Sequence, residues 1–271
     1  MNEYIVFIIS HKKPDEVRTL KALNDSGFFG DYRIIVDSWD ETVEKYEKNY
    51  PGKIEIFDKS EIKKTFDVMD NFNIFSSAVY ARNFSYELAK KLGYKYFILL
   101  DDDLTKFMYV FTEGEKFKKL QIKNINAVFE NIVNYLEKSN SAICSISLDG
   151  GNFGGPKGRY SKGCGRSICA CMICNSEKNC RFCGTQNEDF NLSIKYFQDI
   201  TLEFYFLAVN TPQRGSNSDM YENVGFYKSS FYSFMLRPSG VKLSYKNGHF
   251  TMKRYSRKLF PKILSDSWKL N

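Results

Sequence analysis

The chain has 271 residues, of which 43% are apolar and 26% are charged. This balance is typical of a globular protein and excludes a disordered one. No apolar run approaches the roughly 20 residues that a membrane-spanning helix needs, and no secretory signal pattern opens the sequence. We therefore expect a soluble, cytoplasmic protein without a transmembrane segment, and the sequence indicates no protein partner.

The formal net charge of +7 is concentrated near the end of the sequence. From residue 227 onward the chain has ten Lys and Arg residues but a single acid, Asp266, so the remainder of the chain is nearly neutral. Basic segments bind polyanions, which means nucleic acid or an anionic membrane surface. A solvated basic face would have the same composition.

The first half of the chain alternates between strand and helix patterns. Continuous apolar runs predict buried strands, at residues 4–10, 32–37, 54–57 and 94–100. Helical patterns lie between them, at residues 14–23, 41–50 and 78–92. This succession predicts an α/β fold, with an open and mostly parallel sheet that is flanked by helices on both faces.

The second half of the chain is more elaborate. A helix is predicted at residues 125–136 and a strand at residues 142–147, and seven glycines follow between residues 150 and 165. Such a glycine-rich loop suits a close approach to a ligand. We find no internal repeat or clear linker. The simplest organisation is one domain over residues 1–250 and a basic tail over residues 251–271, which packs on the domain or extends from it.

Three adjacent acids, Asp101, Asp102 and Asp103, follow the apolar run at residues 94–100. Ligands of open α/β sheets bind at the edge where such strands end. Neighbouring carboxylates repel one another, and a divalent cation such as Mg²⁺ or Mn²⁺ relieves this repulsion. Asp101 and Asp103 fall on the same side of an extended chain, so they are the candidate metal ligands. An acidic cap of a helix is the alternative interpretation.

The sequence resembles the glycosyltransferases of the GT-A fold over about residues 3–250. The resemblance rests on motifs that occur in chain order: Ile9-Ser10-His11-Lys12-Lys13-Pro14, Asp37, Ala81-Arg82-Asn83, Leu99-Leu100-Asp101-Asp102-Asp103, Asn187-Glu188-Asp189 and His249. The fourth matches an Asp-x-Asp signature and the fifth an x-Glu-Asp signature. Within this fold, the chain is most similar to phage enzymes that glycosylate hydroxymethylated pyrimidines in DNA, including the TET-associated glycosyltransferases.

The resemblance implies a nucleotide-sugar donor at the carboxyl edge of the sheet. It implies that Ser10 and His11 line the nucleotide pocket and that Asp37 faces the base. The remaining donor contacts that it implies are with the nucleotide, its diphosphate or its ribose, through Arg82, Asn83, Asp101 and Asp102. A metal ion would be held by Asp103, with Asp101 and the late histidine His249, and would stabilise the diphosphate leaving group.

The resemblance also implies a catalytic role for Glu188 and Asp189. In inverting members, an acid of this pair removes the proton of the acceptor hydroxyl, and we assign this role to Asp189 first and Glu188 second. In a retaining enzyme, the two acids would instead position the sugar. Acids at the start of a helix, which complement the helix dipole, are the alternative interpretation of the same residues.

Six of the seven cysteines lie between Cys164 and Cys183. Two C-x₂-C pairs, Cys171 with Cys174 and Cys180 with Cys183, suggest a structural Zn²⁺ site, although they are closer together than in a zinc ribbon. A β-hairpin with buried cysteines, which would turn at residues 175–179, is the alternative. The GT-A resemblance does not require zinc.

The tail interleaves basic residues with aromatic ones, and the candidate nucleic-acid contacts are Lys253, Arg254, Arg257 and Lys258. Cations of this kind contact phosphates, and aromatic rings stack on bases that have been flipped out of a duplex. An anionic membrane surface or a basic helix packed on the body are the alternatives.

We therefore predict a metal-dependent glycosyltransferase, transferring a hexose or a pentose from a UDP-sugar to a hydroxymethylated pyrimidine in DNA. If a phage encodes it, the enzyme would act in the host cytoplasm. One alternative is a GT-A enzyme that acts on a glycan, lipid or protein acceptor. Another is a zinc-dependent nucleic-acid binding module without catalysis.

Overall fold

The computed structural model describes residues 4–71, 73–114, 116–149, 160–162, 170–178, 180–196, 201–212, 226–246 and 249–254. The chain divides into two compact units, Met1–Asn217 and Ser218–Asn271. Residues 255–271, most of the expected tail, lie outside the described residues. The sequence-based division at residue 250 therefore stays a prediction.

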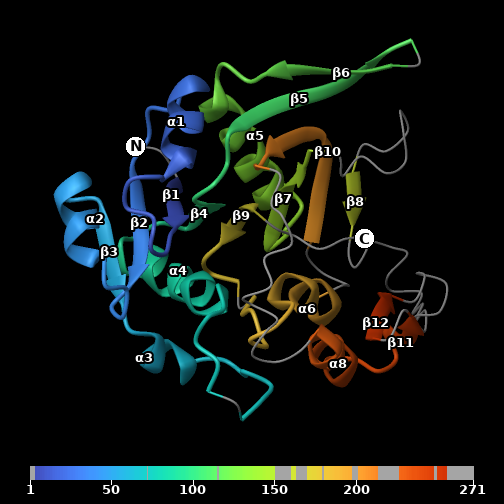
Figure 1. Cartoon of the computed structure of the whole chain (residues 1–271). Coiled ribbons are helices and arrows are strands. Elements are labelled where there is room, and N and C mark those ends of the chain that lie inside the picture. Colours follow the sequence, from blue (N-terminus) through green and yellow to red (C-terminus); the bar gives the residue numbers. More distant parts are fainter. Residues whose placement is uncertain are drawn as a thin grey trace. The chain divides into compact units, whose positions relative to one another are not determined.

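The first unit is built on one ten-stranded sheet. Its strands are β1 (Tyr4–Ile9), β2 (Tyr32–Asp37), β3 (Ile54–Phe57), β4 (Tyr96–Asp101), β5 (Lys106–Glu113), β6 (Lys116–Gln121), β7 (Ile143–Leu148), β8 (Tyr160–Lys162), β9 (Cys171–Asn175) and β10 (Thr201–Asn210). They follow the order β3-β2-β1-β4-β9-β7-β10-β5-β6, with β8 paired to β10 (Figure 1).

Most strands of this sheet run in one direction. The neighbours β3, β2, β1 and β4 are parallel. Strand β9 is antiparallel to both β4 and β7, so β7 and its parallel neighbour β10 run the same way as β4. Strand β5 is antiparallel to β10 and forms a hairpin with β6 at one edge. The predicted α/β class, an open and mostly parallel sheet, is confirmed.

Helices cover both faces of the sheet, because the apolar residues of a strand such as β1 alternate between two cores. Tyr4, Val6 and Ile8 pack with one core, and Ile5 and Phe7 pack with the other. The first core contains residues of α1 (Arg18–Asp25), α2 (Val43–Asn49) and α5 (Ile125–Lys138). The second contains residues of α3 (Lys59–Lys63), α4 (Val79–Lys91) and α6 (Glu188–Lys195) (Figure 1).

The second unit contains α8 (Phe226–Leu236) and a hairpin of β11 (Val241–Lys246) and β12 (His249–Arg254). The helix packs on the hairpin, where the rings of Phe231 and Phe250 meet at 5.4 Å and the hydroxyl of Ser230 donates a hydrogen bond to the carbonyl oxygen of Phe250. No helix in the described part of the chain is long and apolar enough to cross a bilayer.

A tight junction at Gly184 joins the segment after β9 to α6. Gly184 has a φ of +78°, and a Cβ atom there would lie 2.6 Å from the side-chain nitrogen of Asn191. That nitrogen donates hydrogen bonds to the carbonyl oxygens of Cys183 and Gln186. The segment that precedes the predicted catalytic acids is therefore held by contacts that only glycine permits.

We predict that Gly184→Ala lowers the free energy of unfolding by about 3 kcal/mol, because strain in the left-handed region adds to a steric clash. The matched control is Gly52→Ala, where φ is +71° and nothing lies within 4 Å of the added Cβ. This control carries the strain alone and should lose about 1 kcal/mol. Urea denaturation measures both values, and equal losses would contradict the proposed clash.

Candidate active site at the carboxyl edge of the sheet

Several of the predicted donor-site residues gather where the parallel strands end. Ile9, the last residue of β1, pairs with Asp101 of β4, and Asp37 ends the neighbouring strand β2. Helix α1 supports this edge, because the hydroxyl of Thr19 donates to the carbonyl oxygen of Asp101 at 2.6 Å and accepts from the backbone N–H of Leu104. These two hydrogen bonds hold the backbone of the acid cluster in place.

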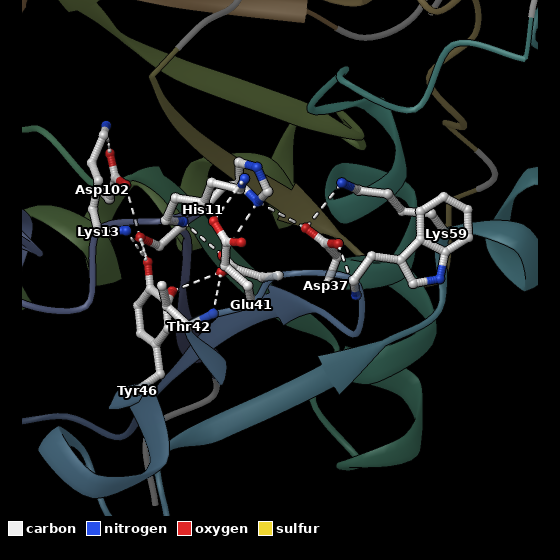
Figure 2. A network of polar contacts seen from close by, with 12 residues as sticks. His11, Lys13, Asp37, Glu41, Thr42, Tyr46, Lys59 and Asp102 are labelled. Carbon is white, nitrogen blue, oxygen red and sulfur yellow. Dashed lines mark hydrogen bonds and ion pairs between the residues drawn. The ribbon is translucent and has the colours of Figure 1, made fainter. Parts of the chain in front are cut away.

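The middle acid of the cluster, Asp102, faces the loop that follows β1. Its Oδ2 accepts a hydrogen bond from the hydroxyl of Ser10 at 2.8 Å, and its Oδ1 pairs with the ammonium of Lys13 at 3.1 Å. The hydroxyl of Tyr46 lies 2.7 Å from that of Ser10 and accepts from the backbone N–H of Lys13 (Figure 2). Asp102 and Tyr46 therefore hold the loop at residues 10–13, and a donor contact of Asp102 stays a prediction.

A second polar group surrounds Asp37. Its Oδ2 lies 3.0 Å from Nδ1 of His11 and 2.9 Å from the ammonium of Lys59, and the same nitrogen of His11 lies 3.3 Å from Asp40 (Figure 2). Burial alone would raise the pKa of Asp37, but hydrogen bonds from His11 and Lys59 outweigh it and lower this pKa to about 2. Asp37 is therefore an ionised, buried carboxylate at neutral pH.

This group could in principle hold a metal ion. His11, Asp37 and Asp40 have ligand atoms within 4.8 Å of one another, and no other such group occurs among the residues that the structure describes. However, the ammonium of Lys59 already pairs with Asp37, and the backbone N–H of Lys12 donates a hydrogen bond to the oxygen of Asp40 that faces His11. A cation would have to displace Lys59, so the arrangement suits the polar edge of a ligand better than a metal.

Asp101 and Asp103 provide the oxygen donors that suit Mn²⁺ or Mg²⁺. The side chain of Asp101 is 31% exposed, so a ligand can reach it, whereas Asp103 is buried. Asp102 is buried as well, and its two oxygens pair with Ser10 and Lys13. The residues at this place fit a divalent cation bound to phosphates.

Helix α4 connects this acid cluster to the start of α6. The guanidinium of Arg82 forms an ion pair with Glu188 at 3.1 Å and approaches Asp101 at 3.7 Å. The amide of its neighbour Asn83 donates to the carbonyl oxygen of Phe182 at 3.1 Å and accepts from the backbone N–H of Phe182 at 3.0 Å. Arg82 thus contacts two acids, and Asn83 contacts a backbone segment. The nucleotide contacts that were predicted for both residues stay predictions.

The two predicted catalytic acids have different surroundings. Burial raises the pKa of Glu188, the charge of Arg82 lowers it and the charge of Asp189 raises it, with a net rise. Asp189 lies beside it in the first turn of α6, and its Oδ1 accepts from the backbone N–H of Phe190. Glu188 is engaged by Arg82, which leaves Asp189 the better candidate for a base.

The cysteines of the predicted zinc site are buried and divided between the two faces of the sheet. Cys171 packs in one core, whereas Cys174 and Cys180 pack in the other. Residues three apart on a strand point to opposite faces, so Cys171 and Cys174 cannot share an ion. In the described part of the chain, the four-cysteine site therefore has no support, and the alternative of buried cysteines fits.

The remaining predicted residues belong to the second unit. His249 begins β12, and its role at a metal stays a prediction. Lys253 and Arg254 end the same strand, and Lys253 is exposed. Arg257 and Lys258 lie outside the described residues.

Sequence reasoning missed Lys59, Asp40 and Tyr46. Lys59 follows β3, which pairs in parallel with β2, so strand order was the signal that could have placed it at this edge. Asp40 comes three residues after Asp37 in a polar turn. Tyr46 gave no signal, because a tyrosine in a helix is most often part of an apolar core.

We predict that Lys59→Met lowers the free energy of unfolding by about 2 kcal/mol at pH 7, because it leaves the buried carboxylate of Asp37 with fewer partners. The pKa of Asp37 is lowered in the folded wild type, so its stabilising effect is present above its unfolded pKa and is lost as the pH falls toward 2. The deficit of the variant should therefore shrink between pH 7 and pH 3. Urea denaturation at both pH values tests this, and a deficit that is constant with pH would contradict it.

Comparisons with known proteins place the chain in a family. A sequence profile described as TET-Associated Glycosyltransferase matches residues 4–215. A comparison with curated proteins finds no match.

Two of the similar solved structures are TarS residues 1–349 from S. aureus, with 13% identity and a TM-score of 0.44, and glucosyl-3-phosphoglycerate synthase from Mycobacterium tuberculosis, with 12% identity and a TM-score of 0.46. The alignments cover 84% of this chain and 64% of TarS 1–349, and 94% of this chain and 87% of the synthase. The chain therefore spans less than two thirds of that TarS structure. Because the family profile covers more than half of the chain, the protein belongs to the family of TET-associated glycosyltransferases.

Proposed function

We propose that this glycosyltransferase transfers a sugar from a UDP-sugar to the hydroxymethyl group of a modified pyrimidine in DNA, with Mn²⁺ or Mg²⁺ as cofactor. The observation that carries the proposal is the arrangement at the carboxyl edge of the sheet. There, the polar group around Asp37 lies on the strand that neighbours β1, and the acids at the end of β4 lie on the other side of β1. A base and a diphosphate would occupy these two places.

The group around Asp37 has the chemistry of a pocket for uracil. A carboxylate can accept the imide N–H of the base, and the donors of His11 and Lys59 can bind its carbonyl oxygens. The indole of Trp39 is 52% exposed and meets the ring of Phe75 at 4.7 Å, and the backbone N–H of Trp39 donates to Asp37. An exposed aromatic ring beside a polar pocket can stack on a planar base.

The acids at the end of β4 suit a divalent cation, which can bind the diphosphate. We infer that Asp103 and Asp101 hold the cation, with His249 as a further candidate, and that Asp102 keeps the loop at residues 10–13 in place. When bound, the cation supplies positive charge to the diphosphate leaving group. The ammonium of Lys13 is half-exposed beside Asp102 and is a candidate for the same phosphates.

The acceptor side is assigned to the start of α6. In an inverting reaction, Asp189 takes the proton from the acceptor hydroxyl as the hydroxyl oxygen attacks the anomeric carbon and the bond to the diphosphate breaks. The dipole of α6 favours the ionised form of an acid in its first turn. In a retaining reaction, Asp189 and Glu188 position the sugar instead.

The DNA acceptor is supported by the family and by the charge of the second unit. The association with TET enzymes suggests hydroxymethylated pyrimidines as acceptors. The basic residues Lys253, Arg254, Arg257 and Lys258 would contact phosphates without reading sequence. A GT-A enzyme with a glycan, lipid or protein acceptor is the alternative. The separation of the cysteines argues against the zinc-dependent binding module.

The test is to incubate the protein with UDP-glucose, UDP-GlcNAc or other UDP-sugars, Mn²⁺, and a duplex that contains 5-hydroxymethylcytosine or 5-hydroxymethyluracil. Mass spectrometry of the digested nucleosides should show the added sugar. Matched duplexes with cytosine and thymine control for other acceptors. Sugar release without a glycosylated nucleoside from either modified base would contradict the DNA acceptor.

We predict that Asp103→Asn abolishes the rise in Tm that UDP with Mn²⁺ produces, and lowers transfer at least about 100-fold, because the cation loses a charged ligand. Asp102→Asn is the matched comparison. It should lower the Tm of the free protein, because it weakens the contact with Lys13, yet keep the Mn²⁺-dependent rise. Thermal unfolding with UDP and with or without Mn²⁺ measures both, and an Asp103→Asn protein that keeps the rise would refute the metal assignment.

A further inference from the structure

In the ion pair of Arg82 with Glu188, both partners are nearly removed from solvent. The side chain of Arg82 is 7% exposed and that of Glu188 is 12% exposed. Charged groups are rarely buried without a specific partner, since each loses its hydration. In addition, the guanidinium lies over the ring of Phe182, 5.7 Å from its centroid. These contacts therefore restrict the guanidinium of Arg82 to one orientation.

The same guanidinium reaches the acid cluster at the end of β4. Its second terminal nitrogen lies 3.7 Å from Asp101, while the first pairs with Glu188 at 3.1 Å. The planar guanidinium has donors in a fixed fork, so it holds two carboxylates in one geometry better than an ammonium could. One side chain thus connects the acids of the proposed donor site to the acids at the start of α6.

The backbone around this connection is also held by α4. Asn83 binds both backbone groups of Phe182, and Arg181 donates to the carbonyl oxygen of Asn83 at 3.0 Å and pairs with Glu87. The anchoring of the segment at residues 181–183 therefore depends on Asn83 and Arg181. Removing the guanidinium of Arg82 should release the acids while leaving the segment in place.

We propose that Arg82 is a positioning residue, which sets the distance between Asp101 on the donor side and Glu188 with Asp189 on the acceptor side. This rests on the proposed roles of these acids. Arg82 touches no reacting atom in this arrangement. It keeps Asp189 in line with a sugar that is bound at Asp101 and Asp103, and a misplacement of about 1 Å at such a site can cost about 100-fold in rate.

This role differs in its kinetics from a contact between Arg82 and the diphosphate. A positioning residue affects the reaction step, so its loss lowers kcat and leaves donor affinity nearly unchanged. A residue that binds the diphosphate in the ground state contributes to donor affinity, so its loss raises the Kd of the donor. The two roles are separated by measuring kcat and the donor Kd in the same variants.

The test uses the full chain with the variants Arg82→Met, Arg82→Lys and Arg181→Met. Arg181→Met is the matched control, because it removes an arginine that pairs α4 with the same segment but has no contact with Asp101 or Glu188 in the described structure. Calorimetry measures the Kd of UDP with Mn²⁺, and UDP release measures turnover on hydroxymethylated DNA and, without acceptor, on water.

We expect kcat to fall about 30- to 100-fold in Arg82→Met while the Kd of UDP stays within about 3-fold of the wild-type value. Arg82→Lys should recover part of kcat, because it restores the charge without the fork. Adding Glu188→Gln to Arg82→Met should cost less than it costs in the wild type, since both changes break one contact. The control Arg181→Met should keep kcat within about 3-fold.

Two outcomes would overturn the proposal. A Kd of UDP that rises more than 10-fold with an unchanged kcat assigns Arg82 to the donor, and an equal loss of kcat in Arg181→Met assigns it to general structure. If the wild type transfers no sugar to DNA, the proposed acceptor fails, and the same comparison is read on the hydrolysis of the donor by water. If Arg82→Met then hydrolysed the donor at the wild-type rate, the positioning role would be refuted.

Discussion

The parallel register between β1 and β4 is the constraint on which the candidate active site depends. Ile9 lies opposite Asp101, so the loop that follows β1 and the acids that end β4 emerge side by side. The contacts of Asp102 with Ser10 and Lys13 are possible only in this register. A shift by one residue would turn every side chain of β4 to the other face and exchange the residues that pack in the two cores. The two apolar cores therefore fix the position of the acids.

The acids of this edge are largely neutralised within the protein. Asp102 pairs with Lys13, Asp37 pairs with Lys59, and Glu188 pairs with Arg82. Buried ion pairs add little net stability, because desolvation offsets much of the attraction between the charges, but they enforce one geometry. The carboxylate of Asp101 differs from these acids in its exposure of 31%, and it also lies 3.7 Å from the guanidinium of Arg82. The cation that we propose would bind at this exposed carboxylate and would in turn bind the diphosphate.

The sequence predicts the parallel half of this fold because each of its elements carries a local signal. The apolar runs of β1 and β4 and the helix α4 are found within two residues of their bounds. The antiparallel insertion of β9 between β4 and β7 has no local signal, because strand order depends on contacts between distant segments. The spacing of Cys171 and Cys174 suggested zinc because a local pattern does not show on which face of the sheet each cysteine lies. Their burial on opposite faces of β9 became evident only once both neighbours of the strand were known.

The candidate site divides in the same way between what a motif can show and what only packing can show. Asp101, Asp103 and Asp189 stand in recognisable patterns, whereas Lys59 and Tyr46 act through partners that are distant in sequence. Arg82 belongs to both classes: the motif singled it out, but the resemblance implied a nucleotide contact for it. Its burial against Phe182 and its two acidic partners change that interpretation. Because Arg82 and Asn83 are consecutive on α4, this one helix contacts Asp101, Glu188 and the backbone of Phe182. The proposed separation between the donor acids and the acceptor acids therefore depends on α4.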